Sequence, residues 1–365
     1  MQNSRSLPND FGSSKISQPI GIAYSLPSKF TSSIDYYPNV GQTIIDPNTH
    51  DTYLLNMVIG SSCTNGLCRV YKALYTKYME NTTSIFVTLK IVYQNLRESV
   101  ELQLQINESI EFTPHSNLIG VKTTFIASYA DYCFLCVSFL YMSQGSLRNI
   151  LSTRPLPEDY IAVVLKEVLV GLRDELHVES RVHKTLNVGD IFVHIDDATE
   201  EISINLAFEA SVYNVGEASS SLSSSFLDVK SVYKWGAAPE VLGGENYTPK
   251  SDIWLLGITA LELAYGDIRV RDYRDLEYII EKIRKKKRLP RSLEKLLINK
   301  KKRKFKKVLG SFKRKEKRVF SEDFENMVLA CLCENPEERP TAHQLSNTPF
   351  FTTAIERFKQ FLLNA

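Results

Sequence analysis

The stretch that decides the fold is Tyr247-Thr-Pro-Lys-Ser-Asp-Ile-Trp-Leu-Leu-Gly-Ile-Thr-Ala-Leu-Glu-Leu-Ala-Tyr-Gly266. Its residues 253–265 carry a helical pattern and predict a helix. Two short motifs stand on either side of it. Ala238-Pro-Glu240 precedes the stretch, and Asn335-Pro-Glu-Glu-Arg339-Pro-Thr-Ala follows it much further along the chain.

Another motif lies upstream, in Leu176-His-Val-Glu-Ser-Arg-Val-His-Lys-Thr-Leu-Asn-Val-Gly-Asp-Ile-Phe-Val193. Its spacing is that of L-H-x-x-x-x-x-H-R-D-x-K-x-x-N-I-L-L, and together these motifs resemble those of eukaryotic protein kinases. The resemblance covers about residues 51–351 and is strongest in its second half. Gly257-Ile-Thr-Ala-Leu-Glu-Leu-Ala264, with the stretch from Arg339 to Phe351, is most similar to the sterile-twenty/germinal-centre kinase family.

The pattern of the whole chain predicts an α+β fold of two lobes, which is also the order that the resemblance implies. The N-terminal lobe, over about residues 51–142, should be a mainly antiparallel sheet with one helix. The C-terminal lobe, over about residues 143–351, should be helical. Short β-branched or aromatic runs predict strands at 53–59, 67–74, 84–92, 123–128 and 133–140, and helices are predicted at 97–112, 157–176, 253–265, 276–287 and 324–333.

The two ends of the chain fall outside this domain. Residues 1–50 are rich in Ser, Asn, Pro and Gly without a sustained period, and we expect a disordered tail there. Residues 352–365 form a short C-terminal tail.

The chemistry that the resemblance implies is missing at several positions. Thr185 replaces the aspartate that accepts the substrate hydroxyl proton, and Asn187 replaces the lysine that neutralises the γ-phosphate. Asp190 stands at the metal-binding asparagine and is a weak metal ligand on its own. Ala207 stands where the main Mg²⁺ ligand belongs, and Glu209 lies one residue out of register. The resemblance therefore implies no intact catalytic site, and no bound metal is expected.

Candidate nucleotide-binding residues remain. Gly60 and Val70 match a degenerate glycine-rich loop, although a plain hairpin explains them equally well. Lys90 in Val87-Thr-Leu-Lys90 matches V-A-I-K, and the alternative is a solvated lysine on a strand. Phe139 stands at the gatekeeper position and Phe192 beneath the adenine, where they can narrow or fill the pocket. Any ATP binding is thus expected to be weak and nearly independent of Mg²⁺.

The glutamate that should pair with Lys90 is not evident. Counting back from His115-Ser-Asn117 leads to Gln105 or Ile106, and Glu101 and Glu108 lie one turn away on either side.

The structural residues of the family, in contrast, are retained. Glu240 and Arg339 match a pair that is buried and ionic in the family, so breaking it should cost about 3–5 kcal/mol. His183, Phe208 and Asp252 match positions of the internal spine that links the lobes.

Positive charge is unevenly distributed. The net charge is +2, yet twenty of the 44 Lys and Arg residues lie between residues 282 and 318. We expect an exposed basic insertion over about residues 284–318, outside the core. Residues 300–304 could direct nuclear entry or contact an anionic surface, or the segment is simply solvated. Few aromatics are interleaved, so sequence-specific nucleic-acid binding is not expected.

Compartment and redox state follow from composition. No apolar run reaches the eighteen or so residues of a spanning helix, and no secretory signal is evident. The six cysteines are expected to be small core residues in a reducing compartment, since Cys133 and Cys136 lie in a predicted strand, although zinc or a disulfide is an alternative. The sequence therefore predicts an intracellular, cytoplasmic protein, with nuclear localisation as an alternative.

The resemblance implies a pseudokinase that acts as an allosteric adaptor in signalling. Its expected partner is an active protein kinase or a helical-repeat scaffold protein. One alternative is an atypical active serine/threonine kinase in which Asp190 and Glu209 hold the ion, and another is a binding module that acts through the basic segment. Residues 219–225 are a serine-rich candidate for phosphorylation or a plain flexible loop, and Tyr233 stands at a substrate-positioning threonine. The oligomeric state is left open.

Overall fold

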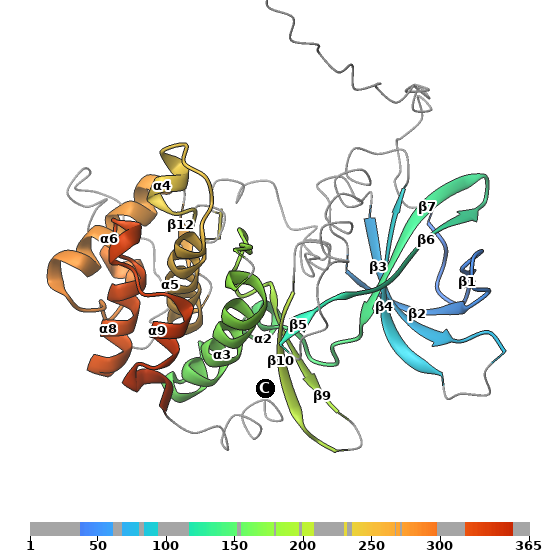
Figure 1. The fold of residues 1–365 in the computed structure, drawn as a ribbon, viewed down its shortest axis with the longest axis horizontal. Helices are drawn as coiled ribbons and strands as arrows, with labels where there is room; N and C mark the ends of the chain where they lie inside the picture. The colour runs from blue at the N-terminus through green and yellow to red at the C-terminus, as the bar shows by residue number, and fades with distance from the viewer. Residues whose placement is uncertain are drawn as a thin grey trace, which may run out of the picture. The chain divides into compact units, whose positions relative to one another are not determined.

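The structure is a computed structural model of the chain. The residues that it describes are 37–60, 68–79, 84–93, 117–151, 155–178, 180–196, 199–207, 230–231, 236–266, 268–270, 272–297 and 318–352. A strand-rich part is followed along the chain by a helical part, as the α+β expectation required (Figure 1).

The strand-rich part is a six-stranded antiparallel sheet whose order is β1-β2-β3-β4-β7-β6. Its strands are β1 (Thr43–Ile45), β2 (Thr52–Gly60), β3 (Cys68–Thr76), β4 (Ile85–Tyr93), β6 (Val121–Tyr129) and β7 (Tyr132–Leu140). All five strands predicted from the sequence in this part are present, each with slightly shifted ends.

This sheet curls so that strands from its two ends meet. The ring of Tyr53 on β2 stacks on Phe125 of β6 at 5.2 Å, and its hydroxyl lies 3.1 Å from Oγ1 of Thr123. The concave face thereby encloses an aromatic core, which also contains Tyr37, Tyr71 and Phe134. Large aromatic side chains fill such an interior with few residues.

Residues 37–50 differ from the expected disordered tail. Ile44 of β1 pairs with Tyr53, and Tyr37 packs against Phe134 in the aromatic core. The side chains of Ile44 and Tyr37 are each 5% exposed. A three-residue strand is too short to show a period, and its burial depends on β2, which explains why the pattern gave no sign of it. The predicted tail is therefore wrong for this part, and residues 1–36 lie outside the described residues.

A second, four-stranded sheet has the order β5-β10-β9-β8. It contains β5 (Leu118–Ile119), β8 (Gly145–Ser146), β9 (Ile191–Ile195) and β10 (Ile202–Ala207), with β5 and β10 parallel and the other pairs antiparallel. A small pair joins β11 (Lys230–Ser231) to β12 (Arg269–Val270). The loop that contains Thr185 leads into β9, and β10 ends at Ala207, so this sheet brings the altered catalytic positions together.

The helical part begins with α2 (Leu147–Leu151) and α3 (Glu158–Gly171), which continues into the π-helical turn η1 (Leu172–His177). Its other helices are α4 (Pro239–Leu242), α5 (Pro249–Tyr265), α6 (Tyr273–Lys286), α8 (Glu322–Cys331) and α9 (Ala342–Ser346), with 3₁₀ turns η5 (Pro336–Glu338) and η6 (Pro349–Thr352). The predicted helix over 97–112 lies outside the described residues.

Helix α5 is the centre of this part, because every residue from Ser251 to Tyr265 is buried. Thr248 and Ser251 form a capping box at its start, which satisfies backbone donors of the first turn. A Cβ on Gly257 would lie 2.8 Å from Cβ of Cys331, so glycine is what allows α8 to pack this closely against α5.

The first part of the basic segment differs from the expectation of an exposed insertion. Helix α6 is amphipathic, and Ile283, Leu289 and Leu293 are buried in the helical core while their basic neighbours face solvent. The expectation is therefore wrong for the part up to residue 297. Residues 298–317 lie outside the described residues.

No helix in the described ranges is both long enough and apolar enough to span a membrane.

Candidate functional site

Residues 183–190, which stand at the position of the family's catalytic loop, are held by the carboxylate of Asp252 on α5. Its Oδ2 accepts hydrogen bonds from the backbone N–H of His183 at 2.8 Å and from Nε2 of His177 at 3.1 Å. Its Oδ1 accepts from the backbone N–H of Lys184 at 2.9 Å. Asp252 and His183 are both fully buried, so these are strong charge-assisted bonds in a low-dielectric setting.

His183 links this loop to β10. Its Nε2 lies 2.7 Å from the carbonyl oxygen of Ala207, which can only accept, so Nε2 carries the proton. Nδ1 is then the acceptor for the hydroxyl of Thr185 at 3.4 Å. Burial lowers the pKa of His183 below its ordinary value, although the charge of Asp252 and the Ala207 carbonyl act in the opposite direction. The ring therefore links the loop to β10 through a buried hydrogen bond.

Thr185 stands at the position of the proton-accepting aspartate. Its side chain is exposed, and its hydroxyl lies within reach of a buried histidine rather than of a carboxylate. A neutral hydroxyl in this setting cannot serve as the general base that phosphoryl transfer from a protein kinase uses.

Asn187 joins several parts of the loop. Its Nδ2 donates to the carbonyl oxygen of Thr185 at 2.7 Å and to Oδ2 of Asp190 at 2.6 Å. Its Oδ1 accepts from the backbone N–H of Gly189 at 2.8 Å and from Nη2 of Arg148 at 2.6 Å. The side chain that replaces the phosphate-binding lysine thus makes its hydrogen bonds within the loop and to Arg148 of α2.

Among the described residues, those at positions 190 and 207 do not fit a bound Mg²⁺. Asp190 is 1% exposed and accepts from Asn187, while Ala207, where the main metal ligand is expected, offers only a methyl group. The backbone N–H of Ala207 donates to the carbonyl oxygen of Asp190 at 2.7 Å, which fixes the two segments together. Hard divalent cations need several oxygen ligands, and this pair of positions supplies at most one carboxylate.

Three of the nucleotide candidates, Gly60, Val70 and Lys90, lie on neighbouring strands of the curled sheet. Lys90 pairs with Val70 and with Val137 in the strand register, so these side chains share a face, and Lys90 is 6% exposed. Gly60 pairs with Val70 at the end of β2. Gly60, Val70 and Lys90 are therefore adjacent in the strand register of β2, β3 and β4.

Apolar side chains are closely packed at this face. Val70, Phe139, Phe192 and Ala207 belong to one buried cluster, and none of them is more than 1% exposed. The cluster joins the six-stranded sheet to β9 and β10. An adenine ring placed between Val70 and Phe192 would have to enter a buried cluster that these side chains share.

One polar group at the same face favours a polar ligand. Oγ1 of Thr88 is buried and has no hydrogen-bond partner within the described residues. Thr88 pairs with Phe139 and lies two residues before Lys90 on β4. A buried hydroxyl without a partner is costly, and a ligand that supplies a donor or acceptor would relieve that cost.

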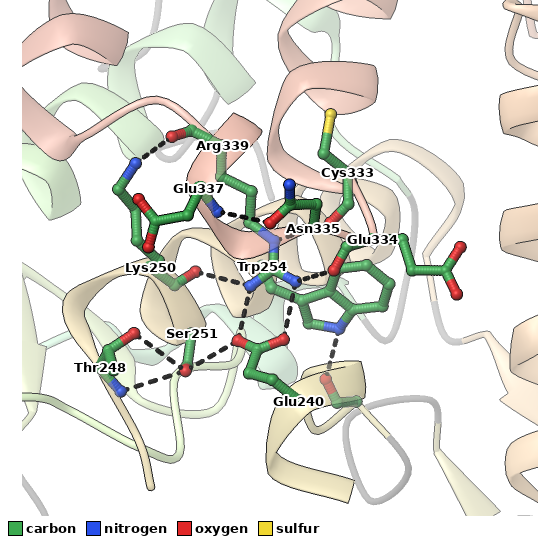
Figure 2. A network of polar contacts seen from close by, with 11 residues as sticks. Glu240, Thr248, Lys250, Ser251, Trp254, Cys333, Glu334, Asn335, Glu337 and Arg339 are labelled. Carbon is green, nitrogen blue, oxygen red and sulfur yellow. Dashed lines mark hydrogen bonds and ion pairs between the residues drawn. The ribbon is translucent and has the colours of Figure 1, made fainter. Parts of the chain in front are cut away.

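The ion pair between Glu240 and Arg339 is present and buried (Figure 2). Nη1 and Nη2 of Arg339 contact the two carboxylate oxygens of Glu240 at 2.7 and 2.8 Å, and Ser251 donates to the same carboxylate at 3.0 Å. The remaining guanidinium donors bind the carbonyl oxygens of Cys333, Lys250 and Glu334. Every N–H donor of the guanidinium is therefore used. The ring of Trp254 covers one face of the guanidinium, with its centroid at 5.0 Å.

A separate cavity of about 500 Å³ lies between α4, α5 and α6. Its lining includes the aromatic residues Trp254, Tyr273 and Tyr278. Charges of both signs surround it, among them Arg284, which pairs with Glu334 at 2.8 Å. The lining therefore sets no clear charge preference for a ligand.

The comparisons with known proteins agree with this geometry. The protein kinase domain family matches residues 69–351, most of the chain. This chain belongs to that family. The resemblance to protein kinases and the two-lobed α+β fold expected from it are confirmed.

Individual relatives are serine/threonine-protein kinases. The chain is similar to fray2 of Dictyostelium discoideum, with 26% identity over 312 residues, which are 84% of this chain and 26% of fray2. It is similar to STE20 of Saccharomyces cerevisiae, with 26% identity over 313 residues, 85% of this chain and 28% of STE20. It is also similar to cst-1 of Caenorhabditis elegans, with 27% identity over 232 residues, 63% of this chain and 40% of cst-1.

These relatives agree with the predicted similarity to the sterile-twenty group. The chain spans only about a quarter to two fifths of the length of these three relatives.

Sequence reasoning missed Arg148 of α2, which reaches the catalytic loop. It lies 39 residues from Asn187, and no local pattern relates the two. Several predicted positions lie outside the described residues, namely Phe208, Glu209, Tyr233, the helix candidates Glu101, Gln105, Ile106 and Glu108, and the segments 219–225 and 300–304.

Replacing Glu240 by Gln should lower the free energy of unfolding by about 3–5 kcal/mol at pH 7, because the charge of Arg339 then stays buried without its counter-ion. Burial raises the pKa of Glu240, but the hydrogen bonds and charge of Arg339 outweigh it and the net shift is downward. The advantage of the wild type over E240Q is therefore complete above the ordinary glutamate pKa of about 4.3 and shrinks as the pH falls below it.

Urea denaturation at a series of pH values measures both effects. The control is E334Q, which removes an exposed partner of Arg284 and should cost less than about 1 kcal/mol. Equal losses in the two variants would show that the buried pair has no special role.

Proposed function

We propose that this chain is a pseudokinase of the sterile-twenty group that acts as an allosteric adaptor for an active protein kinase. The observation that carries the proposal is a contrast between the structural and the catalytic positions around the loop that contains Thr185. Asp252 and His183 make the buried hydrogen bonds that hold the loop in place. In contrast, Thr185, Asn187 and Ala207 stand at the positions of the general base, the phosphate-binding lysine and the main metal ligand.

The loss of activity follows from how phosphoryl transfer is catalysed. A protein kinase positions two substrates and neutralises the phosphates through metal, with little covalent chemistry of its own. Each missing group of this kind typically costs several kcal/mol in the transition state. Thr185 and Ala207 remove two of them, and the bond from Asn187 holds Asp190 inside the loop.

Weak nucleotide binding is part of the proposal. Lys90 and the hydroxyl of Thr88 could contact a polar ligand, and ATP, when bound, would supply an adenine ring and a phosphate group to them. The packed side chains of Phe139 and Phe192 oppose entry of the ring. Binding is therefore weak, and without a metal site it is nearly independent of Mg²⁺.

The adaptor role rests on the retained scaffold. An allosteric adaptor binds its partner through one arrangement of its elements, and a fixed arrangement needs buried, fully bonded contacts. Glu240 with Arg339, and Asp252 with His183, are such contacts. The partner is an active kinase, and a helical-repeat scaffold protein is a further partner that the same surface could serve.

The purified chain should transfer no phosphate to itself or to generic protein substrates. Incubation with labelled ATP and Mg²⁺ should give no more incorporation than Lys90→Ala does, with an active sterile-twenty kinase as the positive control. Incorporation that disappears in Lys90→Ala would establish the atypical active kinase instead, with Asp190 and Glu209 as the candidate metal ligands.

At about 1 mM, ATP should stabilise the chain by no more than about 1.4 kcal/mol, the value for a Kd of roughly 0.1 mM, and equally in Mg²⁺ and in EDTA. A thermal-shift titration measures this. Phe192→Leu should increase the shift by making room beside Val70, whereas Phe351→Leu, the same change in the helical core, should not. A tight complex that requires Mg²⁺ would contradict the prediction.

Added to a set of purified active sterile-twenty kinases, the chain should accelerate at least one of them about fivefold or more, within the usual range of allosteric coupling. Lys90→Ala should stimulate equally, since no catalysis by this chain is involved. Phe208→Ala should stimulate less while still folded by circular dichroism. If no kinase responds, or if stimulation needs Lys90, the adaptor role is wrong.

A further inference from the structure

Side chains from separate elements form a chain of polar contacts at the catalytic loop. Nη1 of Arg148 on α2 lies 3.5 Å from Oε1 of Glu262 on α5, and its Nη2 donates to Oδ1 of Asn187 at 2.6 Å. Asn187 donates in turn to Asp190 at 2.6 Å. One guanidinium thus stands between a carboxylate of the helical core and the loop.

The side chains that make these contacts are largely buried, so the contacts contribute to stability. The side chain of Glu262 is 2% exposed and that of Arg148 is 26% exposed, while Asn187 and Asp190 are at most 7% exposed. Charged groups in such surroundings are costly unless they are paired. The guanidinium therefore offsets a buried negative charge and contacts the loop with the same group.

The local backbone is adapted to the arrangement. A Cβ on Gly189 would lie 2.9 Å from Oδ1 of Asn187 and 3.0 Å from Nε of Arg148, so a larger residue would displace one of them. The N–H of Gly189 also donates to Oδ1 of Asn187. Asn187 has acceptor and donor contacts at opposite ends of its amide, which fixes the orientation of the group.

The identity of residue 187 matters for the same reason. A lysine here would place a second cation where Nη2 of Arg148 now donates at 2.6 Å. Like charges at that distance repel strongly, whereas an amide oxygen accepts. Asn187 can therefore accept a hydrogen bond from Arg148, whereas the lysine usual at this position would repel it.

We propose that Arg148 is an internal counter-cation of the catalytic loop, which holds Asn187 and Asp190 in place without a metal ion or a nucleotide. The proposal rests on the pseudokinase function, because the residues at Ala207 and Asp190 do not fit a bound Mg²⁺. Its consequence is that the loop has one arrangement whether or not ATP is bound, so the adaptor surface would not require a ligand to form.

Hydrogen exchange in the full chain tests this directly. In Arg148→Met, the amides of residues 183–190 should exchange about tenfold faster or more than in the wild type, and the melting temperature should fall by roughly 5 °C. Arg148→Lys should restore part of the protection, because it keeps the charge but not the fork of donors. In the wild type, Mg²⁺ and ATP should leave exchange of this segment unchanged.

The matched control is Arg284→Met, which removes an arginine from an exposed pair with Glu334 and should change neither quantity measurably. Unchanged exchange of residues 183–190 in Arg148→Met would overturn the proposal, even if the protein melts earlier, because the arginine would then only support the helices. Protection of the wild-type segment by Mg²⁺ would overturn it too. The exchange comparison of Arg148→Met does not depend on phosphotransfer, so an active wild type would refute the proposed function separately.

Discussion

The buried carboxylate of Asp252 is the interaction on which the catalytic-loop region depends. It accepts from the backbone N–H groups of His183 and Lys184 and from the ring of His177. Lys184 has a φ of 69°, an uncommon conformation for a residue with a side chain, and its bond to Asp252 helps to hold it there. Because the loop is tied through its backbone, its path does not require an aspartate at Thr185. The residue spacing of the family's motif can therefore be kept when the residues at its catalytic positions are replaced.

A substitution costs the fold little stability at the altered catalytic positions and much stability at the retained structural positions. Thr185 is exposed, so replacing a carboxylate there removes no buried partner. Glu240 is buried with Arg339, and Asp252 is fully buried with its donors, so loss of either side leaves an uncompensated group. A substitution at an exposed catalytic position and a loss of stability are thus separable in this chain.

The sequence was informative where a pattern is local or a motif has fixed spacing. The strands β2, β3, β4, β6 and β7 and the helices α3, α5, α6 and α8 follow from periodicity, and the Glu240–Arg339 pair follows from the resemblance. Strand β1 could not be predicted, since its three residues are buried only through β2. Arg148 could not be predicted either, because it meets Asn187 across 39 residues of chain.

At the face that carries Lys90, apolar packing connects the two sheets. There Val70 on β3 packs in one cluster with Phe192 on β9 and Ala207 on β10, so apolar contact connects the curled sheet to the second sheet. Burying one phenylalanine side chain contributes about 1.5–3 kcal/mol, comparable to the effect of a weakly bound ligand near ten to a hundred times its Kd. Side chains that are always present can therefore hold the two sheets together as a nucleotide would, but without depending on its concentration. Any ligand that enters between the two sheets would first have to separate side chains of this cluster, and the free energy of their burial would be subtracted from its binding free energy.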